Sequence, residues 1–197
     1  CDLQKISKIS KKFGLSIVED AAHAAGSKYK GKKIGNHGNC VCFSFHPVKN
    51  LAMPSGGAIT INSKKGKQFS EILKSKRWAG ITGRKGPIYD VSNLGWNYYM
   101  NEFSAAIGIE QLKKLNKTNS QRKKIGKRFS KELKIEEKMP FNENCSFHFY
   151  WIQVKNRKNF MKKMSENNIE TGIHYNPIHK MSFYNSKSVL PITETAG

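Results

Sequence analysis

Apolar residues at helical spacing open the chain, and short apolar runs follow them. Between positions 3 and 13 these residues are three or four positions apart and Gly14 comes next, which predicts an amphipathic helix over 3–13. Short runs at 15–18, 41–45 and 58–61 are rich in β-branched or aromatic residues and predict strands. Helices and strands that alternate in this way are typical of a layered α/β domain.

The middle of the chain predicts two more helices, and the second is long. Helical patterns cover 69–76 and 101–133, and a Gly-, Pro- and Ser-containing stretch at 79–95 predicts a loop between them. The buried side of the long helix is expected to carry its apolar residues. They are Phe103, Ala106, Ile107, Ile109, Leu112 and Leu115.

A different pattern after the long helix predicts a second, smaller α/β unit. Strands are expected at 149–154 and 170–175, with a helix over 157–167 between them. The expected domain organisation has three parts. They are the later part of a large domain at 1–112, a bridging helix at 113–134 and part of a small C-terminal domain at 135–197.

The net charge of +21 raises the possibility of nucleic-acid binding, because a basic face releases counterions from phosphates. Lys and Arg together number 35, but the excess is almost all Lys and is spread along the chain. Arg would be preferred for bidentate phosphate contacts. Lysines on solvated faces therefore explain the charge better than a nucleic-acid site, which we keep as the weakest hypothesis.

The cysteines and the hydropathy of the chain favour a cytoplasmic protein. The four cysteines, at positions 1, 40, 42 and 145, form no CxxC pair and suggest neither a disulfide framework nor a metal site. No apolar stretch approaches membrane-spanning length and no signal-peptide pattern opens the chain, so no membrane association is expected. The chain begins without Met and stops without a capping element, and we expect it to be a fragment of a longer protein.

Lys49 is the first candidate for chemistry, because it stands where an apolar strand gives way to a loop that contains Pro and Gly. Asp20 ends a second apolar run, where side chains of α/β sheets emerge into the ligand crevice. An acid paired with such a lysine is how proteins hold pyridoxal phosphate. Asp20 capping the turn after it and Lys49 as a solvated surface lysine are the alternatives.

Ser44 and His23 extend the candidate site. Ser44 lies five residues before Lys49, and its hydroxyl is placed to bind a phosphate oxygen. Gly56-Gly57 permits close approach of the backbone. The His23 ring can hydrogen-bond the cofactor or pack over it, although a histidine in a structural role is the alternative. Pyridoxal phosphate is therefore the cofactor that these residue types favour.

Four motifs in order resemble the sugar aminotransferases of the DegT/DnrJ/EryC1/StrS family. They are Val18-Glu-Asp-Ala-Ala-His-Ala24, Phe43-Ser-Phe-His-Pro-Val-Lys-Asn-Leu51 with Gly56-Gly57-Ala58, Leu94-Gly-Trp-Asn-Tyr-Tyr-Met100, and Ala105-Ala-Ile-Gly108 with Gln111-Leu112. The resemblance covers essentially the whole chain but only the middle and later part of a family member. It implies a fold-type I pyridoxal phosphate enzyme, with a mixed, mainly parallel sheet in a large domain and a small C-terminal α/β domain.

The resemblance also implies roles for individual residues. It makes Lys49 the lysine that forms an imine with the cofactor, Asp20 the partner of its ring nitrogen and Ser44 a phosphate ligand. His23 takes the position of a side chain against the cofactor, and Asn97 matches an asparagine that reaches the phosphate of the neighbouring subunit. The active site would then be shared in a homodimer.

The resemblance implies an aminotransferase that moves an amino group, with glutamate as the expected donor, to a keto group of a nucleotide-linked sugar. His174 and Tyr175 match a stretch near the sugar nucleotide. Such reactions belong to cell-surface polysaccharide or natural-product sugar biosynthesis. The alternative is a homologue that binds cofactor or sugar nucleotide without turnover. Family members with dehydratase activity have a histidine at the lysine position, so Lys49 argues against that branch.

Overall fold

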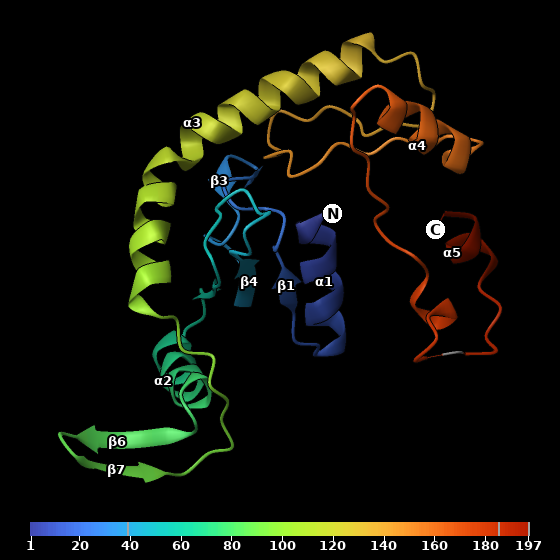
Figure 1. Cartoon of the computed structure of the whole chain (residues 1–197). Coiled ribbons are helices and arrows are strands. Elements are labelled where there is room, and N and C mark those ends of the chain that lie inside the picture. The colour runs from blue at the N-terminus through green and yellow to red at the C-terminus, as the bar shows by residue number, and fades with distance from the viewer. Residues whose placement is uncertain (39, 185, 197) are drawn as a thin grey trace. The chain divides into compact units, whose positions relative to one another are not determined.

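The structure is a computed structural model that describes residues 1–38, 40–184 and 186–196. The chain divides into two compact units, Cys1–Trp151 and Ile152–Gly197 (Figure 1). The first unit holds every strand in the described residues. The predicted division of the complete protein at 112 and 134 stays a prediction.

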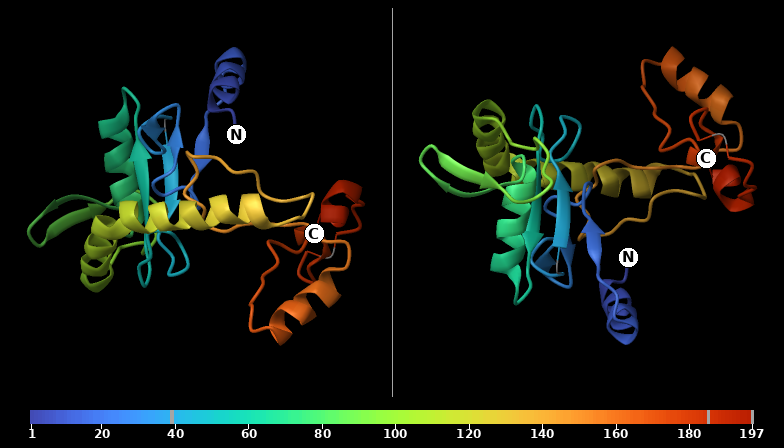
Figure 2. Two further views of the ribbon diagram at one scale, coloured as in Figure 1. Left: turned by 90° about the horizontal axis from the view of Figure 1, so that it is seen from above. Right: turned by 90° about the horizontal axis from the view of Figure 1, so that it is seen from below.

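The first unit contains a three-stranded sheet in the order β1-β4-β5, whose strands lie side by side in Figure 2. β1 (Val18–Asp20) pairs parallel with β4 (Cys40–Ser44), and β4 pairs antiparallel with β5 (Gly57–Ile61). The sheet is therefore mixed, and the strands predicted at 41–45 and 58–61 are confirmed within one residue.

The first predicted strand is displaced along the chain, since 15–18 was expected and 18–20 is observed. Leu15 is held against the preceding helix instead of a strand. Its N–H donates to the Ser10 carbonyl oxygen at 2.9 Å, and its own carbonyl oxygen accepts from Ser10 Oγ at 2.6 Å. Because these groups complete the helix terminus, the chain reaches the sheet only at Val18.

Helices form where the apolar spacing predicts them. α1 (Leu3–Phe13) begins after Asp2, whose side chain accepts from Gln4 N and Lys5 N, and ends at Gly14 with φ 63°. α2 (Gly66–Arg77) and α3 (Glu102–Glu132) follow, and Asn101 caps α3 through Ser104 N. In the described part of the chain, none of the helices is long and apolar enough to cross a membrane.

Two hairpins complete the first unit. β2 (Lys28–Tyr29) pairs with β3 (Lys32–Lys33), and β6 (Ile81–Lys85) pairs with β7 (Ile88–Val91). The prediction of a loop over 79–95 is therefore wrong in its centre. The glycines taken as loop signals serve the hairpin, because Gly86, with φ 59°, lies in the two-residue turn between Lys85 and Ile88.

α3 packs against the sheet unit through small and polar residues, and Figure 2 shows the helix running past the strands in both views. Its buried residues are Ser104, Gly108, Leu115, Asn119 and Gly126. The predicted buried side is correct only for Leu115. The other five apolar residues predicted there are exposed, and Gly108 and Gly126 are buried where a larger side chain would overlap Met53 or Phe147.

Leu115 joins a core beneath the loop that follows β4. The buried members of this core are Ala25, Leu51, Met53 and Leu115, with Phe43, Phe45 and Met100 packed against them. A Cβ built at Gly108 would lie 2.7 Å from Met53 Sδ, so the close approach of α3 is what closes this core.

The second unit contains helices but no strand in its described residues. α4 (Arg157–Glu166), the 3-10 helix η1 (Ile178–Lys180) and α5 (Pro191–Ala196) are its elements. The helix predicted over 157–167 is confirmed, whereas the strands predicted at 149–154 and 170–175 are wrong. Residues 170–175 are mostly exposed, and no neighbouring strand supplies the ladder that an isolated extended segment needs.

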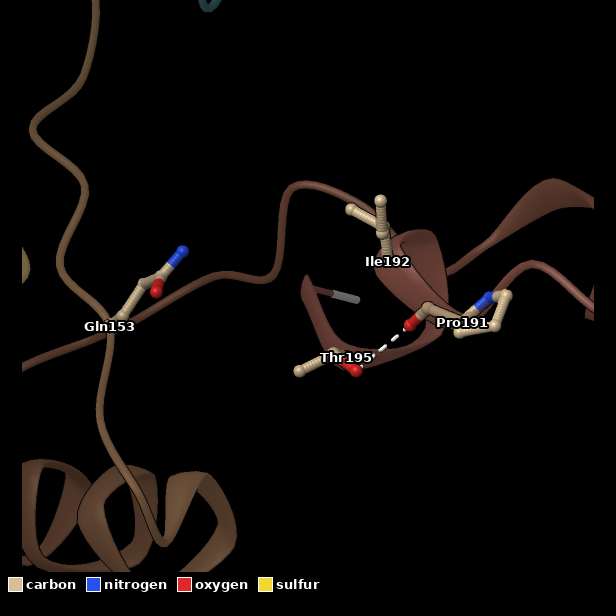
Figure 3. Close-up of a pocket in the computed structure, with 4 residues that line it drawn as sticks. All are labelled: Gln153, Pro191, Ile192 and Thr195. Carbon is tan, nitrogen blue, oxygen red and sulfur yellow. Dashed lines mark hydrogen bonds between the residues drawn. The ribbon is translucent and has the colours of Figure 1, made fainter.

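A shallow cavity of about 410 Å³ lies within the second unit (Figure 3). Gln153, Pro191, Ile192 and Thr195 line it, and Thr195 Oγ1 donates to the Pro191 carbonyl oxygen at 2.8 Å. None of the residues expected in the active site lines this cavity. None of these four lining residues has a charged side chain.

Gly126→Ala is expected to destabilise the first unit by about 1–3 kcal/mol, because the added Cβ would overlap the buried Phe147 ring. That Cβ would lie 2.7 Å from Phe147 Cδ1. Chemical denaturation of the full-length protein measures the change. Gly66→Ala is the matched control, because its Cβ would make only ordinary contacts at 3.6 Å with Ile61 Cγ2. Equal midpoints for the two variants would contradict this account of the packing.

Glu194 is expected to hold α5 in place above about pH 4.5. Lys180 Nζ, at 2.6 Å, is the first cause that lowers the pKa of Glu194 from 4.5 to about 2, followed by Leu190 N and His179. A lowered pKa contributes stability that is present above the unfolded value and is lost as the pH falls through the folded value. Amide protection factors of 191–196 should be lower in Glu194→Gln than in wild type at pH 7.

That difference should shrink as the pH falls from 4.5 towards about 2. Glu166→Gln is the control, because Glu166 forms only an exposed pair with Lys162 at 3.9 Å. A Glu194→Gln difference that stays constant over this pH range would contradict the assignment.

Candidate functional site

Asp20 and Ser44 are brought to one edge of the sheet by the parallel pairing of β1 with β4. Asp20 pairs with Cys42, and Ser44 ends β4 two residues later. Because side chains alternate along a strand, Asp20, Cys42 and Ser44 share one face of the sheet. The carboxylate and the hydroxyl predicted for the cofactor therefore lie at neighbouring strand ends.

Asp20 has a local contact and remains exposed. Its Oδ1 accepts from Ala22 N at 3.0 Å, which is the turn-capping role considered as its alternative. The Asp20 side chain nevertheless remains accessible to solvent. Burial, followed by the nearby Cys40 and Asp20, raises the pKa of the Cys42 thiol, so Cys42 stays a neutral neighbour of the Asp20 carboxylate.

Lys49 lies in a loop that is fixed on both sides. Lys49 N donates to the His46 carbonyl oxygen at 2.8 Å, and His46 N donates to Ser44 Oγ at 3.4 Å. Phe45 closes the base of the loop, because its N–H donates to Gly56 and its carbonyl oxygen accepts from Met53 N, each at 2.9 Å. Lys49 is half-buried in this frame, which limits the positions its amine can reach.

His23 stacks against aromatic rings of a distant segment. Its ring centroid is 4.2 Å from that of His148 in a stacked arrangement, and 5.3 Å from that of Phe149 in an edge arrangement. The His23 carbonyl oxygen accepts from Ser146 Oγ at 3.3 Å. These contacts hold the His23 imidazole against the 146–149 segment.

A buried polar network joins the Lys49 loop to α3, and it was not predicted from the sequence. Asn50 Nδ2 donates to Asn119 Oδ1 and to the Ser146 carbonyl oxygen, both at 2.8 Å. Asn119 Nδ2 donates to the Ala25 carbonyl oxygen at 2.9 Å. The one sequence signal for it is Asn119 itself, a polar residue one helical turn after the buried Leu115.

Asn97 lies in the first unit, whereas His174 and Tyr175 lie in the second unit. Asn97 is exposed and pairs through its backbone with Trp78, beside the end of α2. His174 and Tyr175 are exposed in the second unit, where their ring centroids are 4.8 Å apart. The first unit carries Asp20 and Ser44 at neighbouring strand ends, with Lys49 on the loop after β4 and His23 on the loop after β1.

A cavity of about 490 Å³ opens beside β1, and Asp20 is the single predicted site residue in its wall. Ser44, Lys49 and His23 do not line it, so the Ser44 hydroxyl and the Lys49 amine predicted for the cofactor lie outside this cavity. The described residues also contain no group of His, Cys, Asp or Glu side chains that could hold a metal ion.

The donor set around the strand ends fits pyridoxal phosphate. An exposed carboxylate, a hydroxyl at the neighbouring strand end and an amine on the loop that leaves the same strand match its ring nitrogen, phosphate and aldehyde. A Cβ built at Gly57 would lie 2.7 Å from the Phe43 carbonyl oxygen, so glycine is required beside the Ser44 end of the sheet.

The chain matches the model of the DegT/DnrJ/EryC1/StrS aminotransferase family over residues 1–196. A UDP-4-amino-4,6-dideoxy-N-acetyl-beta-L-altrosamine transaminase of Campylobacter jejuni is 32% identical over 193 residues, which cover 93% of this chain and 50% of that protein. The chain spans about half the length of the curated relatives it matches.

Solved structures of aminotransferases share the fold. Helicobacter pylori PseC, an aminotransferase involved in the biosynthesis of pseudoaminic acid, matches with a TM-score of 0.85 and 26% identity, over 98% of this chain and 54% of that one. AtS13 from Actinomadura melliaura matches with a TM-score of 0.86 and 26% identity, over 99% and 56%. These matches confirm the predicted fold class, part of a fold-type I α/β transferase.

Proposed function

Because the chain belongs to the DegT/DnrJ/EryC1/StrS aminotransferase family, we propose that it is part of a pyridoxal phosphate-dependent aminotransferase. The enzyme transfers an amino group, with glutamate as donor, to a keto group of a nucleotide-linked sugar. It serves cell-surface polysaccharide or natural-product sugar biosynthesis. The observation that carries the proposal is the parallel pairing that sets Asp20 beside Ser44, with Lys49 on the loop that leaves β4.

Each residue of this set has a chemical task. Lys49 Nζ would hold the cofactor covalently and, as a free amine, would move the proton at the reacting carbon. The Asp20 carboxylate accepts from the protonated ring nitrogen, and Ser44 Oγ donates to the phosphate. The His23 imidazole, which stacks on His148, would pack against the cofactor ring. When bound, pyridoxal phosphate supplies the electron-withdrawing ring that makes the amino group transferable.

The exposed position of Asn97 supports a homodimer with shared sites. Within one chain Asn97 lies beside α2, and its neighbours Trp96 and Tyr98 are exposed. Phe103 and Ile107 at the start of α3 are exposed as well, and apolar surface of this kind marks an interface. We propose that this surface meets a second copy, whose cofactor phosphate Asn97 reaches.

The remaining assignments concern the substrate and the compartment. We keep His174 and Tyr175, from the second unit, as contacts of the nucleotide-linked sugar, because they match the family position. The four cysteines are free, which is in keeping with the cytoplasm as the compartment.

Lys49→Ala is expected to abolish covalent attachment of the cofactor and to slow the glutamate half-reaction by about 10²–10⁴-fold, because the proton-transferring amine is removed. Borohydride reduction of the loaded full-length protein, followed by peptide mass mapping, should find the cofactor on Lys49 in wild type only. Lys123→Ala, which removes another half-buried lysine, is the control and should label as wild type does. Label that persists in Lys49→Ala would refute the assignment, and binding without a half-reaction would favour the non-catalytic alternative.

Mixing Lys49→Ala subunits with Asn97→Ala subunits is expected to restore activity. In a mixed dimer, the site that keeps Lys49 receives Asn97 from the other subunit and is complete. Half of the randomly mixed dimers then carry one good site of two, which gives about a quarter of wild-type activity. Activity no higher than that of the separate variants would show that Asn97 does not act across the dimer.

A further inference from the structure

The two loops that carry the proposed cofactor residues are joined by one amide of α3. Asn119 is buried on the helix, and its Nδ2 donates at 2.9 Å to the carbonyl oxygen of Ala25, in the loop that follows Asp20. Its Oδ1 accepts at 2.8 Å from Nδ2 of Asn50, the residue that follows Lys49. The Asn119 side chain therefore links the two loops directly.

The backbone at Gly26 leaves room for the Asn119 amide. A Cβ at Gly26 would lie 2.3 Å from Asn119 Nδ2, so the amide lies directly against a glycine backbone. Gly26 has a φ of 84°, a conformation that other residues rarely adopt. A buried amide needs hydrogen-bond partners, and the two loops supply them on opposite sides.

Asn50 also makes contacts with residues outside α3. Its Nδ2 also donates to the Ser146 carbonyl oxygen at 2.8 Å, and its Oδ1 is 3.2 Å from His148 Nδ1. The His148 ring stacks on His23 at 4.2 Å. Asn50 is thus tied to the Asp20–Gly26 loop by two routes, one through Asn119 and one through the paired imidazoles.

We infer that Asn119 and Asn50 form a clamp that positions Lys49 relative to Asp20 and His23. Both are positioning residues, which act through the backbone of Lys49 without touching the cofactor. The inference rests on the proposed function, because it requires Lys49 to hold the cofactor. A displacement of about 1 Å is enough to cost on the order of a hundredfold in rate, so the clamp bears directly on catalysis.

Asn119→Leu tests the clamp in the full-length protein, because leucine has a similar size and makes neither hydrogen bond. In the unloaded protein, hydrogen–deuterium exchange of 21–26 and 46–51 should rise together by about tenfold or more. In the loaded protein, the pH midpoint of cofactor absorbance should shift, and kcat should fall by about a hundredfold with little change in KM. Asn116→Leu, at an exposed position of the same helix, should change none of these quantities.

Asn119→Asp separates the two halves of the clamp. It keeps the acceptor for Asn50 and loses the donor to Ala25, so exchange of 21–26 should rise more than exchange of 46–51. This variant carries the same test where Asn119→Leu does not fold.

The outcomes separate the two claims. Cofactor absent from Lys49 of the wild-type protein overturns the proposed function and this inference with it. Cofactor on Lys49 of wild type, together with unchanged loop exchange and an unchanged absorbance midpoint in the folded Asn119 variants, overturns this inference alone. A uniform rise of exchange along the chain, without a shift of the absorbance midpoint, also overturns it, since general destabilisation then explains the effect.

Discussion

The parallel pairing of β1 with β4 is the contact on which the candidate site depends. Parallel strands end at the same edge of a sheet, so this pairing brings the Asp20 carboxylate and the Ser44 hydroxyl together from separate parts of the chain. The register is equally important. A slip of one residue would turn Asp20 to the opposite face, away from Cys42 and Ser44. The loop that bears Lys49 then leaves from the same strand end, so one pairing places all three groups.

Contacts from α3 hold the loops at this edge of the sheet in place. The helix presents glycines where it meets Met53 and Phe147, and an asparagine where it meets the two loops. Small residues permit close approach, and the amide supplies hydrogen bonds to backbone and side chain that an apolar residue could not make. The larger apolar side chains of the helix, such as Phe103 and Ile107, remain exposed and suit the interface proposed for a second subunit. Small residues of α3 thus pack in the interior, and its large apolar residues lie on the surface proposed to meet a second subunit.

Features that depend on residues close together in the sequence could be predicted, whereas contacts between distant residues could not. Asp2, Gly14 and Asn101 mark helix ends through contacts within a few residues, and the helices they bound are predicted correctly. The roles of Asp20, Ser44 and Lys49 stay proposals, although their places at strand ends and in a loop follow from neighbouring residues. The Asn119 contacts could not be predicted in this way, because they join residues 94 and 69 positions apart. The buried face of α3 was predicted wrongly because apolar residues were expected to be buried. Where the helix packs closely, the buried residues include Gly108 and Gly126 instead.

The central claim is that the strand ends of β1 and β4 and the loop after β4 form a pyridoxal phosphate site. A crystal structure of the full-length protein with pyridoxal phosphate tests it most directly. The account predicts electron density that is continuous between Lys49 Nζ and the cofactor, with the Asp20 carboxylate within hydrogen-bonding distance of the ring nitrogen and Ser44 Oγ of the phosphate. Cofactor bound elsewhere, or bound here through a different lysine, would contradict it.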